Sequence, residues 1–284
     1  MSAICCSASL VPGISRRSMM AVVMAPTMRC VVPAGTPAPS VAVGRARMTF
    51  RPGRAPARVR GVGAGRVLDQ AGLDLSADSV LITAGAAEAN YLLFRQLVQA
   101  GDEIITEAPG WPQAGVMAKA IGARLVEVPR DETQGWALAP AVVACAITPK
   151  TRMIFLTNPN NPTGRLIPEA DLRALAALAD RHGIWLVVDE VYAGLEWAGP
   201  RPPSIAGLTA FGITTGSVSK ALGLQGLRTG WMICQSPQVI RDAMILRENG
   251  SEIMNVLGEH IAEIALRPER LAASLGRARA EGAE

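Results

Sequence analysis

The sequence predicts an α/β fold in three layers, a mostly parallel sheet with helices on both faces. Three observations support this prediction. From Asp74 onward, short apolar segments alternate with amphipathic segments of helical length. Turn-forming residues separate the two kinds of segment. The chain has 284 residues, 49% of them hydrophobic and 18% charged, so it is long enough to bury the hydrophobic core of a three-layer fold.

The predicted elements follow one another in a strand and helix order. Strands are expected at residues 79–82, 103–106, 124–128, 152–156, 184–188, 212–217 and 230–234. Helices are expected at residues 86–99, 113–121 and 168–182, with further helical segments from Gln238 onward. The apolar side of the first of these helices is formed by Tyr91, Leu92, Phe94 and Leu97. Residues 184–188 are all apolar, which is typical of a central strand that is buried on both faces.

Residues 1–70 differ in composition from the rest of the chain. They are rich in Ala, Arg, Pro, Gly and Ser, show no helical or strand periodicity, and contain ten arginines but no acid before Asp69. Because the net charge is +4, removing those ten positive charges leaves residues 69–284 at −6, so no nucleic-acid partner is expected. We interpret residues 1–70 as a disordered or atypical extension. It is either an organelle transit peptide or the translation of GC-rich DNA in the wrong reading frame or from an early start.

The five cysteines are scattered along the chain. They are Cys5, Cys6, Cys30, Cys145 and Cys234. They lack the paired spacing of a zinc site and the density of a disulfide framework, so neither is expected, and no other metal site is predicted. A reducing compartment is expected: the cytoplasm, or an organelle matrix if residues 1–70 are a transit peptide. The chain contains no uninterrupted apolar run of about 18 residues, so no membrane-spanning helix is expected.

One lysine lies among phosphate-binding residue types at the end of a predicted strand. Ser217, Ser219 and Lys220 are followed by Arg228, and ligands of parallel sheets bind beyond the carboxyl ends of the strands. Hydroxyls and a guanidinium suit a phosphate, and an amine held among them can form a Schiff base with an aldehyde. Most lysines are solvated surface residues. Lys220 is one of only three lysines in the chain, which favours the reactive role.

Two further polar segments end predicted strands. Asp189 follows the strand at residues 184–188, and it can pair with a protonated pyridine nitrogen or simply cap a turn. Tyr192 and Asn161 can both hydrogen-bond the phenolic oxygen of such a ring. Their ordinary alternatives are surface packing for Tyr192 and a turn position for Asn161.

Two earlier segments offer weaker indications. Gly85, Ala86 and Ala87 open the predicted helix at residues 86–99, and the first N–H groups of a helix can bind phosphate. Trp111 follows a Pro-Gly turn. Its ring can stack on a flat cofactor or pack in the core, and the sequence leaves both readings open.

Taken together, these segments resemble the fold-type I enzymes that depend on pyridoxal 5′-phosphate (PLP), and within them the class I/II aminotransferases. The family motifs Asn-Pro-x-Asn-Pro-Thr-Gly, Asp-Glu-x-Tyr and Ser-x-Ser-Lys occur in that order, with an arginine eight residues after the lysine. The resemblance implies that Lys220 forms a Schiff base with PLP and then moves the proton of the substrate α-carbon. It implies that the ring is contacted by Asp189 at its nitrogen, by Asn161 and Tyr192 at its phenolic oxygen and by Trp111 on its face. It implies phosphate contacts from Gly85, Ala86, Ala87, Ser217, Ser219 and Arg228.

The resemblance covers residues 74–266 and implies three regions. These are the extension at 1–70, a PLP-binding large domain at 71–266, and a helical tail at 267–284 that begins a small domain which is largely missing. No counterpart of the family's N-terminal Tyr and Gly ahead of a Leu-Arg pair precedes Asp74, and the arginines of the tail match no motif. We therefore expect an incomplete member whose cofactor pocket is complete and whose substrate pocket is not.

The expected function is transfer of an amino group between an amino acid and a 2-oxo acid, as part of amino acid metabolism or biosynthesis, by a homodimer. The same cofactor cradle serves carbon–sulfur lyases, cyclising synthases and decarboxylases, so these reactions remain alternatives. A catalytically impaired PLP-binding fragment is another alternative. A cofactor sensor of a DNA-binding regulator is not favoured, because residues 1–70 show no helix-turn-helix pattern.

Overall fold

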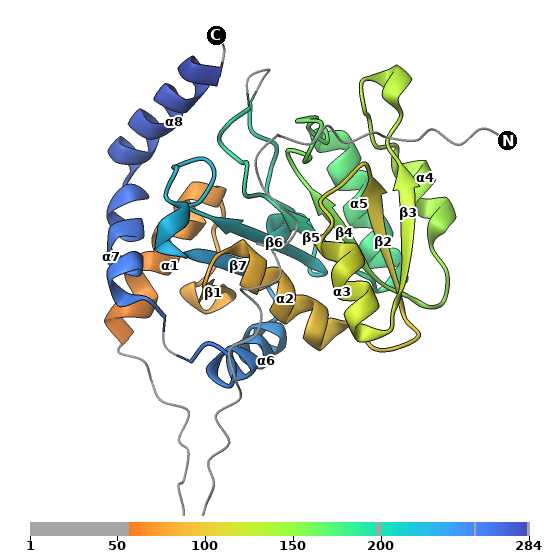
Figure 1. The fold of residues 1–284 in the computed structure, drawn as a ribbon, viewed down its shortest axis with the longest axis horizontal. Helices are drawn as coiled ribbons and strands as arrows, with labels where there is room; N and C mark the ends of the chain where they lie inside the picture. Colours follow the sequence, from red (N-terminus) through yellow and green to blue (C-terminus); the bar gives the residue numbers. More distant parts are fainter. Residues whose placement is uncertain (1–56, 197–199, 253, 283–284) are drawn as a thin grey trace, which may run out of the picture. The chain divides into compact units, whose positions relative to one another are not determined.

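The computed structural model describes residues 57–196, 200–252 and 254–282. In this part of the chain a seven-stranded sheet has the order β1-β7-β6-β5-β4-β2-β3 (Figure 1). Strand β7 is antiparallel to both of its neighbours, and the other neighbouring pairs are parallel. The prediction of a mostly parallel α/β sheet is confirmed.

The elements alternate along the chain as expected. The strands are β1 Val80–Thr83, β2 Glu103–Ala108, β3 Arg124–Pro129, β4 Thr151–Thr157, β5 Trp185–Asp189, β6 Gly212–Ser217 and β7 Gly230–Cys234. The helices are α1 Ala57–Ala71, α2 Ala86–Leu97, α3 Gln113–Ile121, α4 Pro140–Ala146, α5 Glu169–His182, α6 Pro237–Glu248, α7 Val256–Ala265 and α8 Pro268–Gly282. None of the described helices combines the length and the apolar character that crossing a membrane requires.

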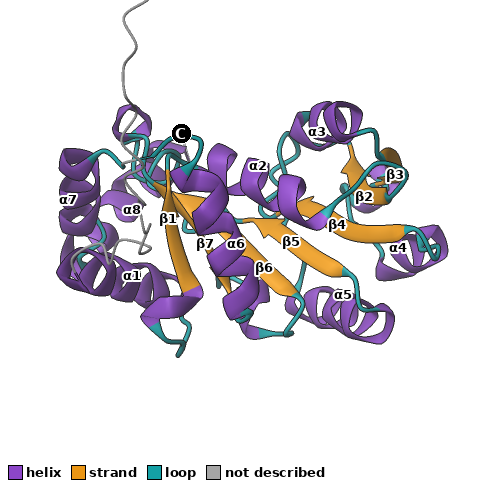
Figure 2. Cartoon of the chain, turned by 90° about the horizontal axis from the view of Figure 1, so that it is seen from below, coloured by secondary structure: helices purple, strands orange, loops and turns teal. Residues whose placement is uncertain are grey.

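Helices cover both faces of the sheet, which confirms the three layers. Figure 2 shows α2 and α3 on one face and α5 on the other, and α6 packs in the same cluster as α2 and α3. The first face is packed by side chains such as Leu93, Phe94 and Met117. On the opposite face, α4 and α5 pack over β2 to β5, while α1 and α7 pack over β1 and β7. Burial of these apolar surfaces is the main force that holds the layers together.

Two helices were not predicted. Helix α1 lies within the segment that was expected to lack periodicity, and its Ala64, Val67 and Leu68 are buried. Its glycines and arginines hide the pattern, and packing against the sheet rather than propensity stabilises it. Helix α4 has only seven residues, too few to show a helical period. The remaining part of the predicted extension, residues 1–56, lies outside the described residues.

Several predicted boundaries shift by one or two residues. Helix α2 ends at Leu97 rather than at residue 99, because Val98 is already extended with φ −126°. Tyr91, which was assigned to the apolar side of this helix, is exposed. Strand β5 ends at Asp189 itself, so the backbone of this residue belongs to the sheet and not to the loop that follows.

Candidate functional site

The three polar motif segments lie at one edge of the sheet. The loop 158–164 follows β4, the turn with Tyr192 follows β5, and Lys220 follows β6. These strands are adjacent and parallel, so their carboxyl ends meet at the edge where ligands of such sheets bind. The start of α2, which follows β1, reaches the same edge.

Arg228 and the first turn of α2 form a cationic end of this edge. Gly85, the N-cap of α2, has a left-handed backbone with φ 89°. Arg228 Nη2 donates a hydrogen bond to Ala84 O at 3.1 Å. A Cβ at residue 85 would stand 2.6 Å from that nitrogen, so glycine lets the guanidinium lie against the start of the helix. The N–H groups of Ala86 and Ala87 have no acceptor within the helix, and together with the guanidinium they suit a dianion.

Ser217 lies close to this cationic end. A Cβ on Gly230 of β7 would stand 2.5 Å from Ala86 N and 2.7 Å from Gly216 O, so the ends of α2 and β6 flank that glycine. Ser217 is buried at the end of β6, and its Oγ accepts a hydrogen bond from Ser219 N at 3.2 Å. Its hydroxyl proton therefore remains to donate to a ligand.

Asp189 is a buried carboxylate at the end of β5, 7% exposed. Its Oδ2 accepts a hydrogen bond from Asn90 Nδ2 at 2.8 Å, and its Oδ1 accepts one from Val191 N at 3.1 Å. The pKa of Asp189 is raised to about 6, mainly because the carboxyl group is buried. The two hydrogen bonds and the charge of Lys220 act to lower this pKa, and the charge of Glu190 acts to raise it. A carboxylate in this environment is suited to bind a cationic group of a ligand.

Tyr192, Asn161 and Lys220 lie together in front of the sheet. Asn161 Nδ2 donates a hydrogen bond to the Tyr192 hydroxyl at 3.4 Å. Lys220 Nζ is 5.9 Å from the centroid of the Tyr192 ring, within the range of a cation–π contact. Lys220 is exposed, as a surface lysine would be, but its charge also acts on Asp189. Its amine therefore faces the other residues that the sequence singled out.

Trp111 is 51% exposed, so its alternative reading as a core side chain is wrong. It follows β2, whose carboxyl end lies at the same edge as those of β4 and β5. The stacking of its ring on a cofactor stays a prediction.

A buried ion pair that the sequence analysis did not identify lies at the carboxyl ends of β2 and β3. The guanidinium of Arg130 donates to Glu107 Oε2 through Nε at 3.0 Å and Nη2 at 2.7 Å, and both side chains are almost fully buried. Glu107 Oε1 accepts a hydrogen bond from Thr157 N at 2.8 Å. The pair thus joins the ends of β2, β3 and β4, from which the loops with Trp111 and Asn161 begin. The sequence offered only a weak signal, two charged residues that end apolar strands.

Asn90 was missed as well. It contacts Asp189 from α2, on a face of that helix where Leu93 and Ala86 are buried. An amide among apolar helix positions was the available signal, because a buried polar side chain needs a partner.

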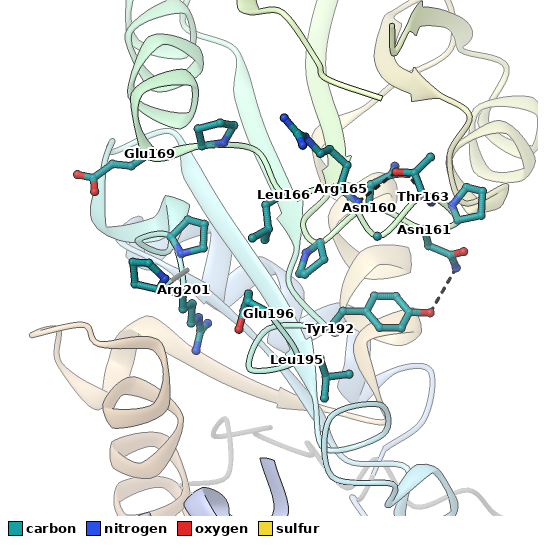
Figure 3. A pocket seen from close by; sticks show the side chains of 16 residues that line it. Asn160, Asn161, Thr163, Arg165, Leu166, Glu169, Tyr192, Leu195, Glu196 and Arg201 are labelled. Carbon is teal, nitrogen blue, oxygen red and sulfur yellow. Dashed lines mark hydrogen bonds between the residues drawn. The ribbon is translucent and has the colours of Figure 1, made fainter. Parts of the chain in front are cut away.

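A cavity of about 950 Å³ opens beside Asn161 and Tyr192. Figure 3 shows the Tyr192 ring reaching from the turn after β5 toward the Asn161 amide. The charged residues that line the cavity are Arg165, Glu169, Glu196 and Arg201. Arg201 pairs with Glu190 at 2.8 Å, and Glu196 pairs with Arg279 of α8 at 3.5 Å. The cavity leaves room for a small molecule next to the phenolic and amide groups.

The chain is similar in sequence to several aminotransferases. A family model described as aminotransferase class I and II matches residues 58–279. The chain is 36% identical over 166 residues to the arginine–pyruvate transaminase of Pseudomonas aeruginosa, which covers 58% of this chain and 42% of that protein. It is 34% identical over 172 residues to the aspartate/prephenate aminotransferase of Thermus thermophilus, covering 60% of this chain and 44% of the relative. It is 32% identical over 207 residues to the valine–pyruvate aminotransferase of Mycobacterium tuberculosis, covering 72% of this chain and 53% of the relative.

Solved structures show the same relationship. The aspartate aminotransferase of Thermus thermophilus with maleate superposes with a TM-score of 0.73 at 29% identity, over 78% of this chain and 58% of that one. An aminotransferase from Mycobacterium tuberculosis superposes with a TM-score of 0.71 at 28% identity, over 78% of this chain and 57% of that one. The chain thus spans about half the length of the relatives that it matches.

Proposed function

Since the chain belongs to the class I and II aminotransferase family, we propose that it binds PLP and transfers an amino group between an amino acid and a 2-oxo acid. The observation that carries the proposal is the meeting of Lys220, Tyr192 and Asp189 at one edge of the sheet. The cavity beside Tyr192 adds room for a substrate.

The residues present fit this cofactor. The guanidinium of Arg228, the open N–H groups of α2 and the Ser217 hydroxyl would hold its phosphate, and Gly85 supports the fit because a Cβ there would displace the guanidinium. Asp189 would meet the protonated ring nitrogen. The Asn161 amide and the Tyr192 hydroxyl would hold the phenolic oxygen, and Trp111 would cover one face of the ring.

The chain's own residues would supply binding, orientation and proton transfer. When bound, PLP supplies an aldehyde that condenses with amines and a ring that draws electrons from the bonds of the substrate α-carbon. Lys220 Nζ would attach the cofactor and, once released and neutral, would take the proton from the α-carbon. Asp189 would hold the positive charge on the ring nitrogen, which keeps the ring electron-poor. Tyr192 would orient the ring by its hydrogen bond to the phenolic oxygen.

A half-reaction assay tests the proposal. The purified chain is loaded with PLP and incubated with single amino acids, and formation of pyridoxamine phosphate is followed. The panel starts with arginine, aspartate and valine, because the relatives carry these amino acids in their names. We expect pyridoxamine phosphate to form and then to disappear on addition of pyruvate. Ammonia released with a 2-oxo acid would indicate a lyase, carbon dioxide a decarboxylase, and a bound cofactor with no product an impaired fragment.

We also propose a homodimer. Helix α7 exposes Val256, Leu257 and Ile261, with exposed fractions of 61, 76 and 45%. A second cavity of about 350 Å³ lies beside them, between α1, β7 and α7. Three exposed apolar side chains on one helix support burial of that helix against a second copy.

The homodimer has its own test. In analytical ultracentrifugation we expect the unchanged chain to sediment as a dimer and Leu257→Glu to sediment as a monomer, since a charge at that position would be buried without a partner. Ile245→Glu serves as the control, because Ile245 is also an exposed apolar side chain but lies on α6. A Leu257→Glu protein that remains a dimer would contradict an interface on α7.

The cytoplasm is the compartment that we propose. Cys145 and Cys234, the cysteines among the described residues, are both free thiols. Free thiols are usual in reducing compartments.

A further inference from the structure

Asn90 is a buried amide in the layer between α2 and the sheet. Its exposed fraction is 1%, so its polar atoms depend on protein partners. Thr215 Oγ1 of β6 donates to its Oδ1 at 2.8 Å. Its Nδ2 donates to Asp189 Oδ2 at 2.8 Å and to Gln113 Oε1 of α3 at 3.1 Å. Both amide hydrogens and the amide oxygen are therefore engaged, and the amide links the two helices with β5 and β6.

The orientation of this amide is fixed by its partners. An ionised carboxylate can only accept hydrogen bonds, so the Nδ2 side must face Asp189 and the Oδ1 side must face the hydroxyl of Thr215. Gln113 is itself held by its Nε2, which donates to Ala87 O at 3.1 Å. The side chain of Asn90 thus has one arrangement in which every group is satisfied.

The hydrogen bond from Asn90 acts on a carboxylate that changes its charge near pH 6. Burial raises the pKa of Asp189 to about 6, and the Asn90 hydrogen bond is the strongest influence that opposes it. Two charged groups also act on Asp189: Glu190, the next residue, raises its pKa, and Lys220, after β6, lowers it. The Asn90 and Thr215 side chains on α2 and β6 are neutral. Val191 N occupies the other oxygen, and a carboxylate with about four lone-pair sites still has room for a further donor.

We infer that Asn90 is a positioning residue for Asp189, holding its carboxylate ionised and oriented to accept a protonated ring nitrogen. The inference deepens the proposed function and rests on it, because it assumes that Asp189 meets the cofactor nitrogen. Asn90 itself need not touch the cofactor.

Two substitutions at this position separate an electrostatic role from a packing role. Asn90→Leu removes the donor at similar volume, and Asn90→Asp keeps the shape but places a second carboxyl beside Asp189. The titration of Asp189 is followed in the ligand-free chain by NMR of ¹³C-labelled carboxyl groups, assigned with Asp189→Asn. We expect the midpoint to rise by about one pH unit in Asn90→Leu and by more in Asn90→Asp.

PLP binding gives a second readout. We expect the dissociation constant of Asn90→Leu to rise about tenfold near pH 5.5 and to return close to that of the unchanged chain near pH 8.5, because there Asp189 is ionised in both. Gln99→Leu, at an exposed position just after α2, is the matched control and should leave both readouts unchanged.

Three outcomes would overturn the inference. They are an Asp189 midpoint that does not move, a loss of affinity that is equal at all pH values, and normal behaviour of Asn90→Asp. Failure of the unchanged chain to bind PLP would contradict the proposed function instead. The carboxyl titration would then still show whether Asn90 controls the charge of Asp189.

Discussion

Replacing Lys220 with alanine is expected to abolish covalent retention of PLP and to reduce amino-group transfer by at least about 10²–10⁴-fold. That range is what a positioned acid or base contributes to a proton transfer. The reason is that Lys220 Nζ is the amine that faces Tyr192 and acts on Asp189. Retention is measured by borohydride reduction of the loaded chain, followed by mass spectrometry of its peptides, which should place the added mass on Lys220.

The chain offers a matched control for this experiment. Lys119 is an exposed lysine on α3, and Lys119→Ala should retain both the cofactor and the activity. Added mass on Lys119 or Lys150 in the unchanged chain, or full activity of Lys220→Ala, would contradict the role assigned to Lys220.

Replacing Asp189 with asparagine is expected to weaken PLP binding by about 10²–10⁴-fold. Removing one partner of a buried charge pair costs about 3–5 kcal/mol, and asparagine cannot neutralise a protonated ring nitrogen. In the unchanged chain, Asp189 loses its charge as the pH falls through about 6. The affinity of that chain should therefore fall about tenfold per pH unit below this value. Because the phosphate of PLP also titrates, the informative quantity is the ratio of the two dissociation constants, which should shrink toward acid pH.

The same substitution should have the opposite effect on the stability of the ligand-free chain. A carboxyl pKa that is raised by folding makes the folded state less stable as pH rises from about 4 to about 6. Removal of the charge should therefore increase the free energy of unfolding near pH 7. We expect a gain of about 1–3 kcal/mol, because the amide has only one acceptor oxygen and the loss of one hydrogen bond offsets part of the gain. Denaturant unfolding measures this gain, with Asp78→Asn at an exposed carboxylate as the control. A variant that lost both stability and cofactor binding would show that Asp189 is mainly structural.

Much of the fold was predictable because apolar segments repeat with strand and helix spacing from residue 79 onward. The segment Leu186–Val188, for example, is apolar at every position, as the centre of a buried parallel sheet requires. Helix α1 was not predictable, because its stability comes from contacts of Val67 and Leu68 with distant residues. The end of α2 was misplaced because a β-branched residue, Val98, leaves the helix before the turn at Gly101.

The candidate site was predictable to the extent that it consists of short motifs. Asn161, Tyr192 and Lys220 were singled out because each follows a strand, and the parallel order of β4, β5 and β6 brings them together. Asn90 and Glu107 could not be assigned in this way. Asn90 acts through Asp189, 99 residues away in sequence, and Glu107 acts through Arg130, 23 residues away. Such pairs cannot be identified from one sequence before the topology of the fold is known.

The ion pair between Glu107 and Arg130 has a consequence for the ways in which this sequence can change. A substitution of either residue alone would strand a charge in the interior, at a cost of about 3–5 kcal/mol, which is comparable with the whole stability of many domains. Exchange of both residues for apolar ones of similar volume would avoid the stranded charge, and the remaining cost would be that of leaving Thr157 N without its acceptor, about 1–3 kcal/mol. Positions 107 and 130 are therefore free to vary only together, and libraries that aim to reshape the neighbouring loops should treat them as one site.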